Sequence, residues 1–236
     1  FKLDIDGVLK SKAKKHYNKI PKFAINYLKR IIYQDELNAI IERNKDKEGV
    51  DFMRVLVDKE FKVNLKIHGE ENIPEDGKFI FASNHPLGGL DGICLSAHLG
   101  EKYNGKIKYL VNDVLLNIKN LESIFVPINK YGSQAKQSAI AINDAYASEN
   151  QIITFPAGLC SRKQNGQIKD LDWMKSFIVK AVEFERDIIP VYFDAKNSNF
   201  FYNFANIRKS LGMKFNIELI YLPSEMFKNK NQTFHI

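Results

Sequence analysis

The chain has 236 residues, 44% of them hydrophobic and 27% charged, which is the composition of an ordinary folded globular protein. No apolar run approaches the ~20 residues that a membrane-spanning helix needs. The formal net charge is +7, and residues 1–34 carry all of it, with eight lysines, one arginine and two aspartates. Positive charge gathered at one end indicates an anionic partner: a membrane surface, a nucleic acid or an acidic carrier protein.

The cysteines and the chain ends bear on where the protein works. Cys94 and Cys160 are its two cysteines, so no disulfide framework is indicated and a reducing compartment, the cytoplasm, is expected. The sequence starts at Phe1 without a signal-peptide pattern and stops in "NQTFHI", a plausible strand. We therefore expect a piece trimmed from a longer protein, with a truncated C-terminus.

Residues 1–60 are expected to form a basic helical segment. The stretch "PKFAINYLKRIIYQDELNAIIERN", residues 21–44, is predicted to be one helix with apolar side chains on one face and Lys29 and Arg30 opposite. Such a helix lies on anionic lipid or packs on its own domain with solvated lysines, and the sequence leaves both open. Before it, "LDIDGVL" matches the nucleophile motif of haloacid-dehalogenase phosphatases. No later acidic pair suits magnesium, so we expect a surface turn there.

From residue 61 to residue 236, predicted strands and helices alternate. This pattern is typical of an α/β domain with a mixed, largely parallel sheet flanked by helices. In such sheets, function gathers in loops that leave the carboxyl ends of strands. The loops "SNHPLGGLD" and "PAGLCSRK" are both of that kind. Strands are expected at residues 61–67, 78–83, 106–111, 123–128, 151–156, 187–193 and 215–222, and helices at 92–100, 114–118, 133–149, 173–185 and 200–209.

The first loop combines a histidine with a carboxylate. Asp91 can hold one ring nitrogen of His85 and fix its tautomer, while the other nitrogen takes a proton from a hydroxyl. Gly88 and Gly89 suit a sharp loop with positive φ or a close approach to a ligand. The alternative is a simple turn with Asp91 as a helix cap. The spacing of His85 and Asp91 does not decide between the two by itself.

The second loop combines glycine, hydroxyl and cations. Gly158 is followed by Ser161, Arg162 and Lys163, a set that suits an anionic or polar head group. The alternative is a solvated basic loop. Cys160 as a nucleophile is disfavoured, because no oxyanion element beside it can be identified from sequence.

Together the two loops resemble the glycerolipid acyltransferase superfamily, the 1-acylglycerol-3-phosphate acyltransferases and their relatives. That family has Asn-His, four residues and Asp after a strand, then Phe-Pro-Glu-Gly-Thr-Arg-Ser, then an apolar block of the "IPV" type. The counterparts here are Asn84-His85 with Asp91, then "FPAGLCSR", then "IIPVYF". The three blocks occur in the family's order and strand context, across residues 62–236.

A hemolysin-like subgroup, which includes O-acyltransferases that make ornithine or glycine lipids, is more similar still. Its members have His-Pro-x-Gly-Gly-x-Asp, Phe-Pro-Ala-Gly, and Asn-Ser followed by aromatics. This chain has "HPLGGLD", "FPAG" and "FDAKNSNFF". It departs from the main family by one extra residue between His85 and Asp91 and by Ala157 where the glutamate stands. The lost glutamate puts a lysophosphatidate acceptor in doubt, and the closer resemblance to the subgroup favours an amino-acid lipid.

The resemblance implies transfer of a fatty acyl group to the hydroxyl of a lysolipid, either lysophosphatidate or a lyso-amino-acid lipid. The donor would be a thioester of acyl carrier protein or coenzyme A, as co-substrate, and no metal or bound cofactor is implied. His85 would be the general base, oriented by Asp91, and N–H groups of the glycine loop would stabilise the oxyanion. The residues expected to bind substrate are Asn84, Gly88, Gly89, Gly158, Ser161, Arg162 and Lys163.

The basic N-terminal segment would bring the enzyme to the inner face of the membrane as a peripheral protein, or to an acidic carrier. One rival is a lipid-surface binding protein of the same fold without turnover, against which the intact His85 and Asp91 argue. A nucleic-acid partner is not expected, because no motif for groove or base recognition occurs. The aromatic stretch "NSNFFYNFANI" lines an acyl channel, dips into lipid or fills the core, and the sequence leaves these open.

Overall fold

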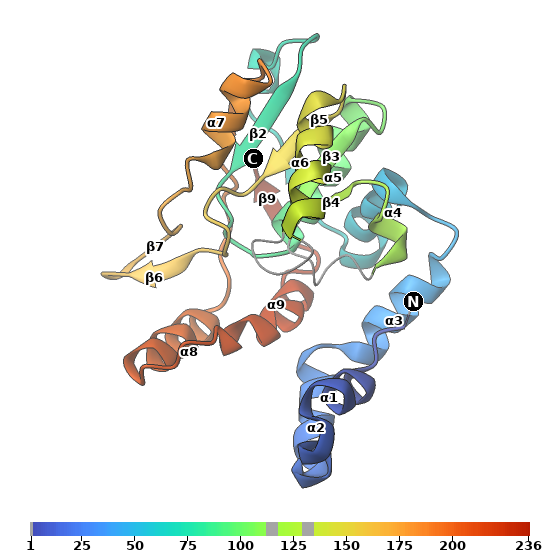
Figure 1. The fold of residues 1–236 in the computed structure, drawn as a ribbon, viewed down its shortest axis with the longest axis vertical. Helices are drawn as coiled ribbons and strands as arrows, with labels where there is room; N and C mark the ends of the chain where they lie inside the picture. The colour runs from blue at the N-terminus through green and yellow to red at the C-terminus, as the bar shows by residue number, and fades with distance from the viewer. Residues whose placement is uncertain (1, 112–117, 129–134) are drawn as a thin grey trace.

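The structure, a computed structural model, describes residues 2–111, 118–128 and 135–236. Its centre is a sheet of five strands in the order β4-β3-β5-β2-β8 (Figure 1), and each neighbouring pair runs parallel. The predicted α/β fold with a largely parallel sheet is therefore confirmed. The short helix expected at residues 114–118 lies almost wholly outside the described residues. The strands are β2 (Phe79–Ser83), β3 (Ile107–Val111), β4 (Phe125–Pro127), β5 (Gln151–Thr154) and β8 (Asp187–Val191).

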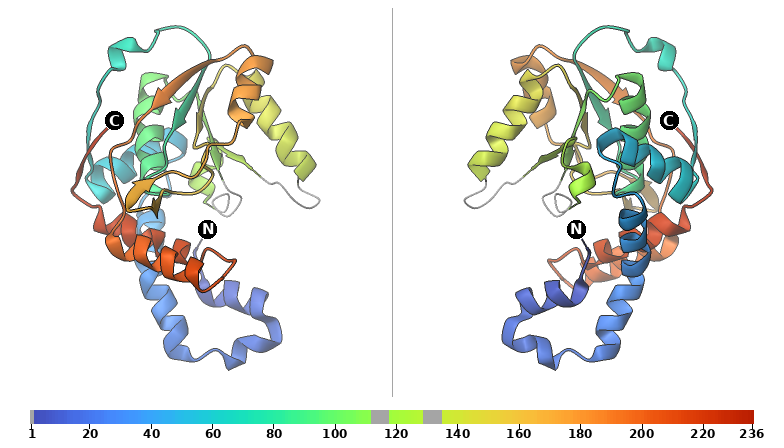
Figure 2. Two further views of the ribbon diagram at one scale, coloured as in Figure 1. Left: turned by 90° about the vertical axis from the view of Figure 1, so that its left-hand side faces the viewer. Right: turned by 90° about the vertical axis from the view of Figure 1, so that its right-hand side faces the viewer.

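Helices cover both faces of this sheet (Figure 2). Successive residues of a strand point to opposite faces, so Phe79 and Phe81 of β2 pack in the core with α4 and α5, while Ile80 packs with α6 and α7. Because both faces are covered, every residue of β2 and β5 is buried, and β2 is apolar except for Ser83. The helices are α4 (Gly49–Val55), α5 (Leu90–Lys102), α6 (Ala135–Ala147) and α7 (Ser176–Glu183).

The single helix predicted for residues 21–44 is wrong in one respect, because it is broken in the middle. It forms α2 (Lys22–Ile31) and α3 (Gln34–Arg43). The break falls at Tyr33, whose backbone is left-handed with φ 55°. Its ring stacks on Phe227, with ring centroids 4.3 Å apart. Contact with this C-terminal ring gives Tyr33 a conformation that a continuous helix does not allow.

The surface turn expected at "LDIDGVL" is also wrong, since this stretch begins helix α1 (Ile5–Ala13), which the 3₁₀ turn η1 (Lys14–Lys19) follows. Asp6 in its first turn forms an ion pair with Lys29 and accepts a hydrogen bond from the Tyr17 hydroxyl at 2.6 Å. These contacts, led by Lys29, hold the pKa of Asp6 below its ordinary value. In the described part of the chain, histidine, cysteine and carboxylate side chains form no cluster of three or more suited to a metal ion.

The strand expected at residues 215–222 is wrong as well. The chain there forms a 3₁₀ turn, η6 (Ile217–Tyr221), followed by helix α9 (Leu222–Lys228). Proline near the start of α9 suits the first turn of a helix, where its missing N–H costs nothing. Glu218 is fully buried between two arginines, so the apolar alternation read from the sequence does not describe its side-chain directions.

The remaining elements lie around the sheet. The helix predicted at residues 200–209 is confirmed as α8 (Asn199–Ser210), and the final strand as β9 (Thr233–His235). Strand β9 pairs in parallel with β1 (Asn64–Lys66), apart from the main sheet. Strand β1 is shorter than the predicted 61–67, because a π-helical turn, η2 (Leu56–Phe61), occupies its start.

A small hairpin of β6 (Arg162–Gln164) and β7 (Gln167–Lys169) follows the second loop and was not predicted. Asn165 and Gly166 connect its strands, with φ of 51° and 83°. Asn-Gly is the pair most typical of such a two-residue turn. The sequence therefore held the signal for this hairpin.

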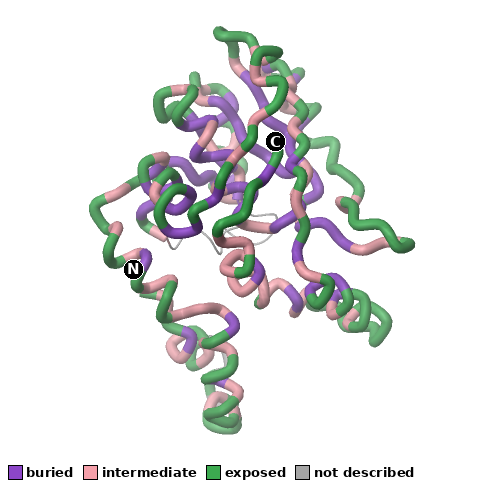
Figure 3. The backbone as a smooth tube through the Cα atoms, turned by 180° about the vertical axis from the view of Figure 1, so that it is seen from behind, coloured by how far each residue is buried: buried purple, intermediate pink, exposed green. Residues whose placement is uncertain are grey.

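Burial is concentrated in the sheet, α4 and α5, while much of the N-terminal helices and of α8 is exposed (Figure 3). Residues of α4 and η2 belong to the same core as the sheet, and the domain division at residue 60 stays a prediction. A search of the described residues found no helix with the length and apolar character that crossing a bilayer requires.

Candidate active site

His85 and Asp91 meet in the loop between β2 and α5. Nδ1 of His85 lies 2.9 Å from Oδ2 of Asp91, whose side chain is fully buried. The carboxylate accepts the Nδ1 proton, which leaves Nε2 as the basic nitrogen. Within the described part of the chain nothing hydrogen-bonds Nε2, and the His85 side chain is 13% exposed. This geometry suits a general base that is open to a substrate hydroxyl.

The backbone of its own loop holds Asp91 in place. Burial alone raises the pKa of a carboxyl, but His85 and the surrounding N–H groups outweigh it and hold the pKa of Asp91 below its ordinary value. Asp91 is therefore ionised at neutral pH and can stabilise an imidazolium on His85. The donors are the N–H groups of Leu87 (2.9 Å), Gly88 (3.2 Å), Gly89 (3.0 Å) and Gly92 (2.9 Å).

The expectation that the glycine loop stabilises an oxyanion stays a prediction. The N–H groups of Gly88 and Gly89 both point at Asp91, so they are not free to meet a substrate in this conformation. Gly88 is needed for another reason. Its φ is 77°, and a Cβ there would lie 2.9 Å from Cβ of Cys160, so the two loops pack through this glycine.

Phe155 lies directly against the ring of His85. The two ring centroids are 4.1 Å apart at an angle of 31°, and Phe155 in turn meets Tyr109 edge-on at 5.6 Å. Both aromatic residues are buried. An apolar surface here excludes water from one side of His85, which strengthens its interaction with Asp91. The sequence motif contained Phe155 but did not indicate this role.

The Asn84 side chain bonds to the backbone just beyond β8, and its predicted place among the substrate ligands stays a prediction. Its Nδ2 donates to the carbonyl of Phe193 at 3.0 Å, and its Oδ1 accepts the Phe193 N–H at 2.6 Å. The side chain thus continues the pairing of β2 with β8 just beyond the strand ends. Since both ends of the amide are occupied, Asn84 supports the backbone beside His85.

Ser161 also supports the backbone of His85, and its predicted contact with substrate stays a prediction. Its N–H donates to the His85 carbonyl at 2.7 Å, and its Oγ donates to Asp170 at 2.6 Å. Asp170 accepts the His85 N–H at 3.1 and 3.2 Å to its two oxygens. The sequence analysis missed Asp170 because it lies in no recognised motif.

The guanidinium of Arg162 is buried and bonded within the protein, and its predicted role as a head-group ligand stays a prediction. Its Nη2 donates to Oε1 of Glu218 at 3.0 Å, and its Nη1 donates to the Cys160 carbonyl at 2.6 Å. Glu218 also accepts two hydrogen bonds from Arg208, both at 3.1 Å. One carboxylate therefore lies between two guanidinium groups and joins the second loop to α8 and η6.

Cys160 is buried beside this ion pair. Its Sγ accepts a hydrogen bond from Arg162 at 3.0 Å, and burial raises the pKa of the thiol to about 11. A thiol that stays protonated at neutral pH is a poor nucleophile. This environment disfavours Cys160 as a nucleophile.

Gly158 and Lys163 are accessible to a substrate, because neither is fully buried. Gly158 is exposed, with φ of 70°. Lys163 is half-buried in β6 and forms no ion pair with any described residue. Both therefore stay predicted contacts for an acceptor.

The Asn-Ser pair after β8 joins the histidine loop to the C-terminal helices. Nδ2 of Asn197 donates to the carbonyls of Pro86 and Leu87, each at 3.3 Å. Ser198 caps α8 and donates its N–H and Oγ to Glu225 of α9 at 2.6 and 2.8 Å. Hydrogen bonds of Asn197 and Ser198 therefore connect the start of α8 and helix α9 to the histidine loop.

The aromatic side chains that follow this pair divide between two environments. Phe201 and Tyr202 are fully buried in a cluster with Cys160. Phe200 is 48% exposed and stacks on Phe204, with ring centroids 5.8 Å apart. The core interpretation is confirmed for the buried pair.

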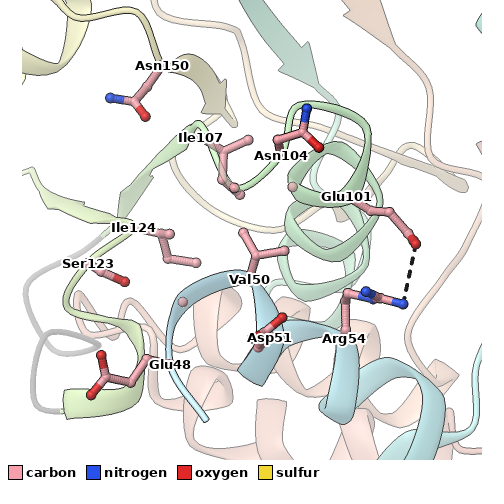
Figure 4. A pocket seen from close by; sticks show the side chains of 13 residues that line it. Glu48, Val50, Asp51, Arg54, Glu101, Asn104, Ile107, Ser123, Ile124 and Asn150 are labelled. Carbon is pink, nitrogen blue, oxygen red and sulfur yellow. Dashed lines mark ion pairs between the residues drawn. The ribbon is translucent and has the colours of Figure 1, made fainter.

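An open pocket of about 550 Å³ lies away from these residues (Figure 4). It includes Ile107 at the start of β3 and Asn150 just before β5, and the ion pair of Arg54 with Glu101 at 3.3 Å lies on its wall. The pocket lies at the amino ends of the parallel strands, whereas His85 lies beyond the carboxyl end of β2, at the other end of the sheet. This pocket is therefore separate from the catalytic pair.

Comparisons with known proteins show which family the chain belongs to. Residues 7–236 match a family described as acyltransferase. A protein of Bacteroides thetaiotaomicron named lyso-glycine lipid O-acyltransferase is 51% identical over 237 residues, covering 100% of this chain and 86% of the relative. A protein of the same name from Phocaeicola vulgatus is 51% identical over 235 residues, covering 99% of this chain and 84% of the relative.

Among solved structures, the 1-acyl-sn-glycerophosphate acyltransferase of Thermotoga maritima is similar at 18% identity and a TM-score of 0.43, over 62% of this chain and 57% of that one. The chain belongs to the acyltransferase family. It is an O-acyltransferase of the lysolipid-acylating type, as its sequence motifs predicted. The family match starts at residue 7, so it also takes in most of the N-terminal segment.

Proposed function

We propose that this protein transfers a fatty acyl group to the hydroxyl of a lyso-glycine lipid and so completes a glycine lipid. The observation that carries the proposal is the 51% identity, over essentially the whole chain, to two relatives named for this activity. The preformed pair of His85 and Asp91 supplies the chemistry. The missing glutamate at Ala157 also favours an acceptor other than lysophosphatidate.

In the proposed reaction, Nε2 of His85 takes the proton from the lipid hydroxyl as its oxygen attacks the thioester carbonyl carbon. The C–O bond forms and the carbonyl oxygen becomes an oxyanion. The intermediate collapses by breaking the C–S bond. The leaving sulfur takes the proton from the His85 imidazolium and departs as a thiol. Asp91 stays ionised and stabilises the imidazolium between the two steps.

Lys163 is the residue proposed to attract the acceptor's anionic head. Arg162 and Ser161, the neighbouring candidates, are bonded to Glu218 and Asp170, whereas Lys163 has no such partner among the described residues. An ammonium group suits a single carboxylate as a point charge. Exposed Gly158 leaves room for the acceptor beside it.

The donor is proposed to be a thioester of acyl carrier protein or of coenzyme A, and the site of action the inner face of an anionic membrane. Phe23 and Tyr27 of α2 are 77% and 52% exposed, beside exposed Lys22 and Arg30. Apolar and basic side chains on one helix are typical of interfacial helices.

The test offers purified protein lyso-glycine lipid and lysophosphatidate side by side, each with acyl carrier protein and coenzyme A thioesters in detergent. We expect turnover of the glycine lipid to exceed that of lysophosphatidate clearly with at least one donor. A preference for lysophosphatidate would overturn the acceptor assignment. Lipid binding without acyl transfer to either acceptor would favour the non-catalytic alternative.

A further inference from the structure

Exposed apolar side chains gather at residues 207–215, which include the end of α8 and the loop after it. We call these residues the C-terminal tip. A phenylalanine that is 82% exposed is unusual, and side chains of this size on one projection typically mark a binding surface. The exposed fractions are 56% for Ile207, 70% for Leu211, 41% for Met213 and 82% for Phe215.

Hydrogen bonds within the C-terminal tip and to the residue after it hold its backbone in place. Arg208 donates to the carbonyl of Met213 at 2.8 Å and to Oδ1 of Asn216 at 2.8 Å. The same guanidinium is bonded to buried Glu218, which Arg162 of the second loop also holds. The apolar side chains are thus presented by a supported backbone, and the support leads to the active site.

Charge identifies the kind of surface that covers the tip. Lys209 and Lys214 are exposed there, and residues 199–217 contain no aspartate or glutamate. Helix α7 also exposes apolar side chains, but Glu183 lies in it and Glu185 follows it. An apolar projection whose charged neighbours in the sequence are all basic suits an anionic membrane surface, where apolar groups insert and lysines remain among the head groups.

We propose that the C-terminal tip inserts into an anionic membrane surface and holds the active site against the lipid that carries the acceptor. The choice of a lipid partner rests on the proposed function. Helix α8 starts two residues after Asn197, which contacts the histidine loop, and its 12 residues span about 18 Å to the tip. The N-terminal helices lie on the same side of the sheet (Figures 1 and 2), where Tyr27 and Tyr221 share a hydrogen bond of 2.9 Å.

The test compares Leu211→Asp/Phe215→Asp with a control, Val179→Asp/Val182→Asp, which places the same charges on exposed sites of α7. Both are sedimented with vesicles of phosphatidylglycerol and phosphatidylcholine, and thermal unfolding establishes that each is folded. We expect the tip variant to bind about tenfold or more weakly, and the control to bind like the wild type. The KM for vesicle-borne acceptor should rise in the tip variant. With a short-chain acceptor in free solution, its kcat/KM should equal that of the wild type.

Equal vesicle binding by the folded tip variant and the wild type would overturn the inference. So would loss of activity with acyl carrier protein alone, while vesicle binding and the coenzyme A reaction persist, since the tip would then bind the carrier. If the tip variant fails to fold, Phe215→Ser serves instead, with the same expectation in smaller degree. Tip-dependent vesicle binding without turnover of lyso-glycine lipid would leave this inference standing and defeat the proposed function.

A second observation, the position of Asp170, carries an independent inference. Its carboxylate accepts the Ser161 hydroxyl at 2.6 Å, the His85 N–H at 3.1 and 3.2 Å, and Nε1 of Trp173 at 3.0 Å. It also follows the β6–β7 hairpin, and its own carbonyl accepts a hydrogen bond from Gln164 at 3.1 Å. The Asp170 carboxylate therefore joins the backbone of His85 to Ser161 of the second loop and to Trp173.

We infer that Asp170 is a positioning residue that sets the orientation of His85 for proton transfer. Asp170→Asn replaces one accepting oxygen by a donor, so the three donors cannot all be satisfied. We expect kcat to fall by about 10- to 100-fold with KM within about twofold, because a displaced base affects reaction more than binding. The matched control is Asp172→Asn, at an exposed site with no hydrogen bond to a described residue.

Combination with His85→Ala separates positioning from a general loss of structure. If Asp170 acts through His85, Asp170→Asn should not slow the residual reaction of His85→Ala any further. A further slowing by the full factor, or a raised KM with unchanged kcat, would refute the inference. If Asp170→Asn does not fold, Trp173→Phe, which removes one donor, should lower kcat by a smaller factor with KM unchanged.

Discussion

Arg162 donates to the fully buried carboxylate of Glu218 at 3.0 Å, and this bond joins the second loop of the site to the C-terminal helices. The family motif suggests a head-group ligand at this arginine. The structure instead gives it a partner 56 residues along the chain. The site is therefore held from the side of α8 and η6 as well as by the sheet.

Arg162→Ala is expected to lower the free energy of unfolding by about 3 kcal/mol, because it removes one partner of a buried carboxylate. Arg208 stays bonded to Glu218 and limits the loss. Urea unfolding measures the effect. Lys163→Ala is the control: it should leave stability within about 0.5 kcal/mol and raise KM for the acceptor. The opposite pattern, a stable Arg162 variant with raised KM, would restore Arg162 as the head-group ligand.

His85→Ala should reduce acyl transfer by about 100- to 10,000-fold while the protein stays folded, because Nε2 is the base for the acceptor hydroxyl. Steady-state rates with lyso-glycine lipid measure this, and circular dichroism checks the fold. His16→Ala, at an exposed site in the N-terminal segment, is the matched control and should be fully active. Near-normal turnover by folded His85→Ala would contradict the assigned role.

The sequence predicted the parts of the protein that follow from local pattern. The buried strand β2 is apolar over four successive residues, and the pair of His85 and Asp91 lies in one loop. Sequence proximity of the two side chains makes their contact predictable. The order of the three motifs then identified the family.

The sequence could not show which polar side chains the protein uses for its own support. Asn84 meets Phe193, Arg162 meets Glu218, and both contacts join residues more than 50 positions apart. Similarly, Tyr33 breaks a helix that its own surroundings favour, because Phe227 lies opposite it in the fold. Contacts with residues distant in the sequence determine each of these conformations, and local sequence spacing does not indicate such contacts.

Asp91→Asn should be nearly inactive and also less stable. The pKa of Asp91 is held below its ordinary value of 3.8, so its ionised form contributes stability above that pH, and the contribution is lost as pH falls through the lowered value. The amide would also turn its NH₂ toward N–H donors. Acid unfolding followed by fluorescence should show a weaker dependence on pH in Asp91→Asn. An unchanged acid limb would show that other carboxyls dominate.

Cys160→Ser should retain activity within about threefold of the wild type, because a serine hydroxyl can accept the hydrogen bond that Arg162 gives to the thiol. The thiol's pKa of about 11 keeps it protonated across the neutral range, and Cys160 is 2% exposed. Alkylation by iodoacetamide at neutral pH should therefore be slow in the folded protein and fast in urea. Cys94 is equally buried, with a raised pKa, and should behave alike. A folded Cys160→Ser without activity, together with rapid alkylation of the native wild type, would point to a thiol nucleophile instead of His85.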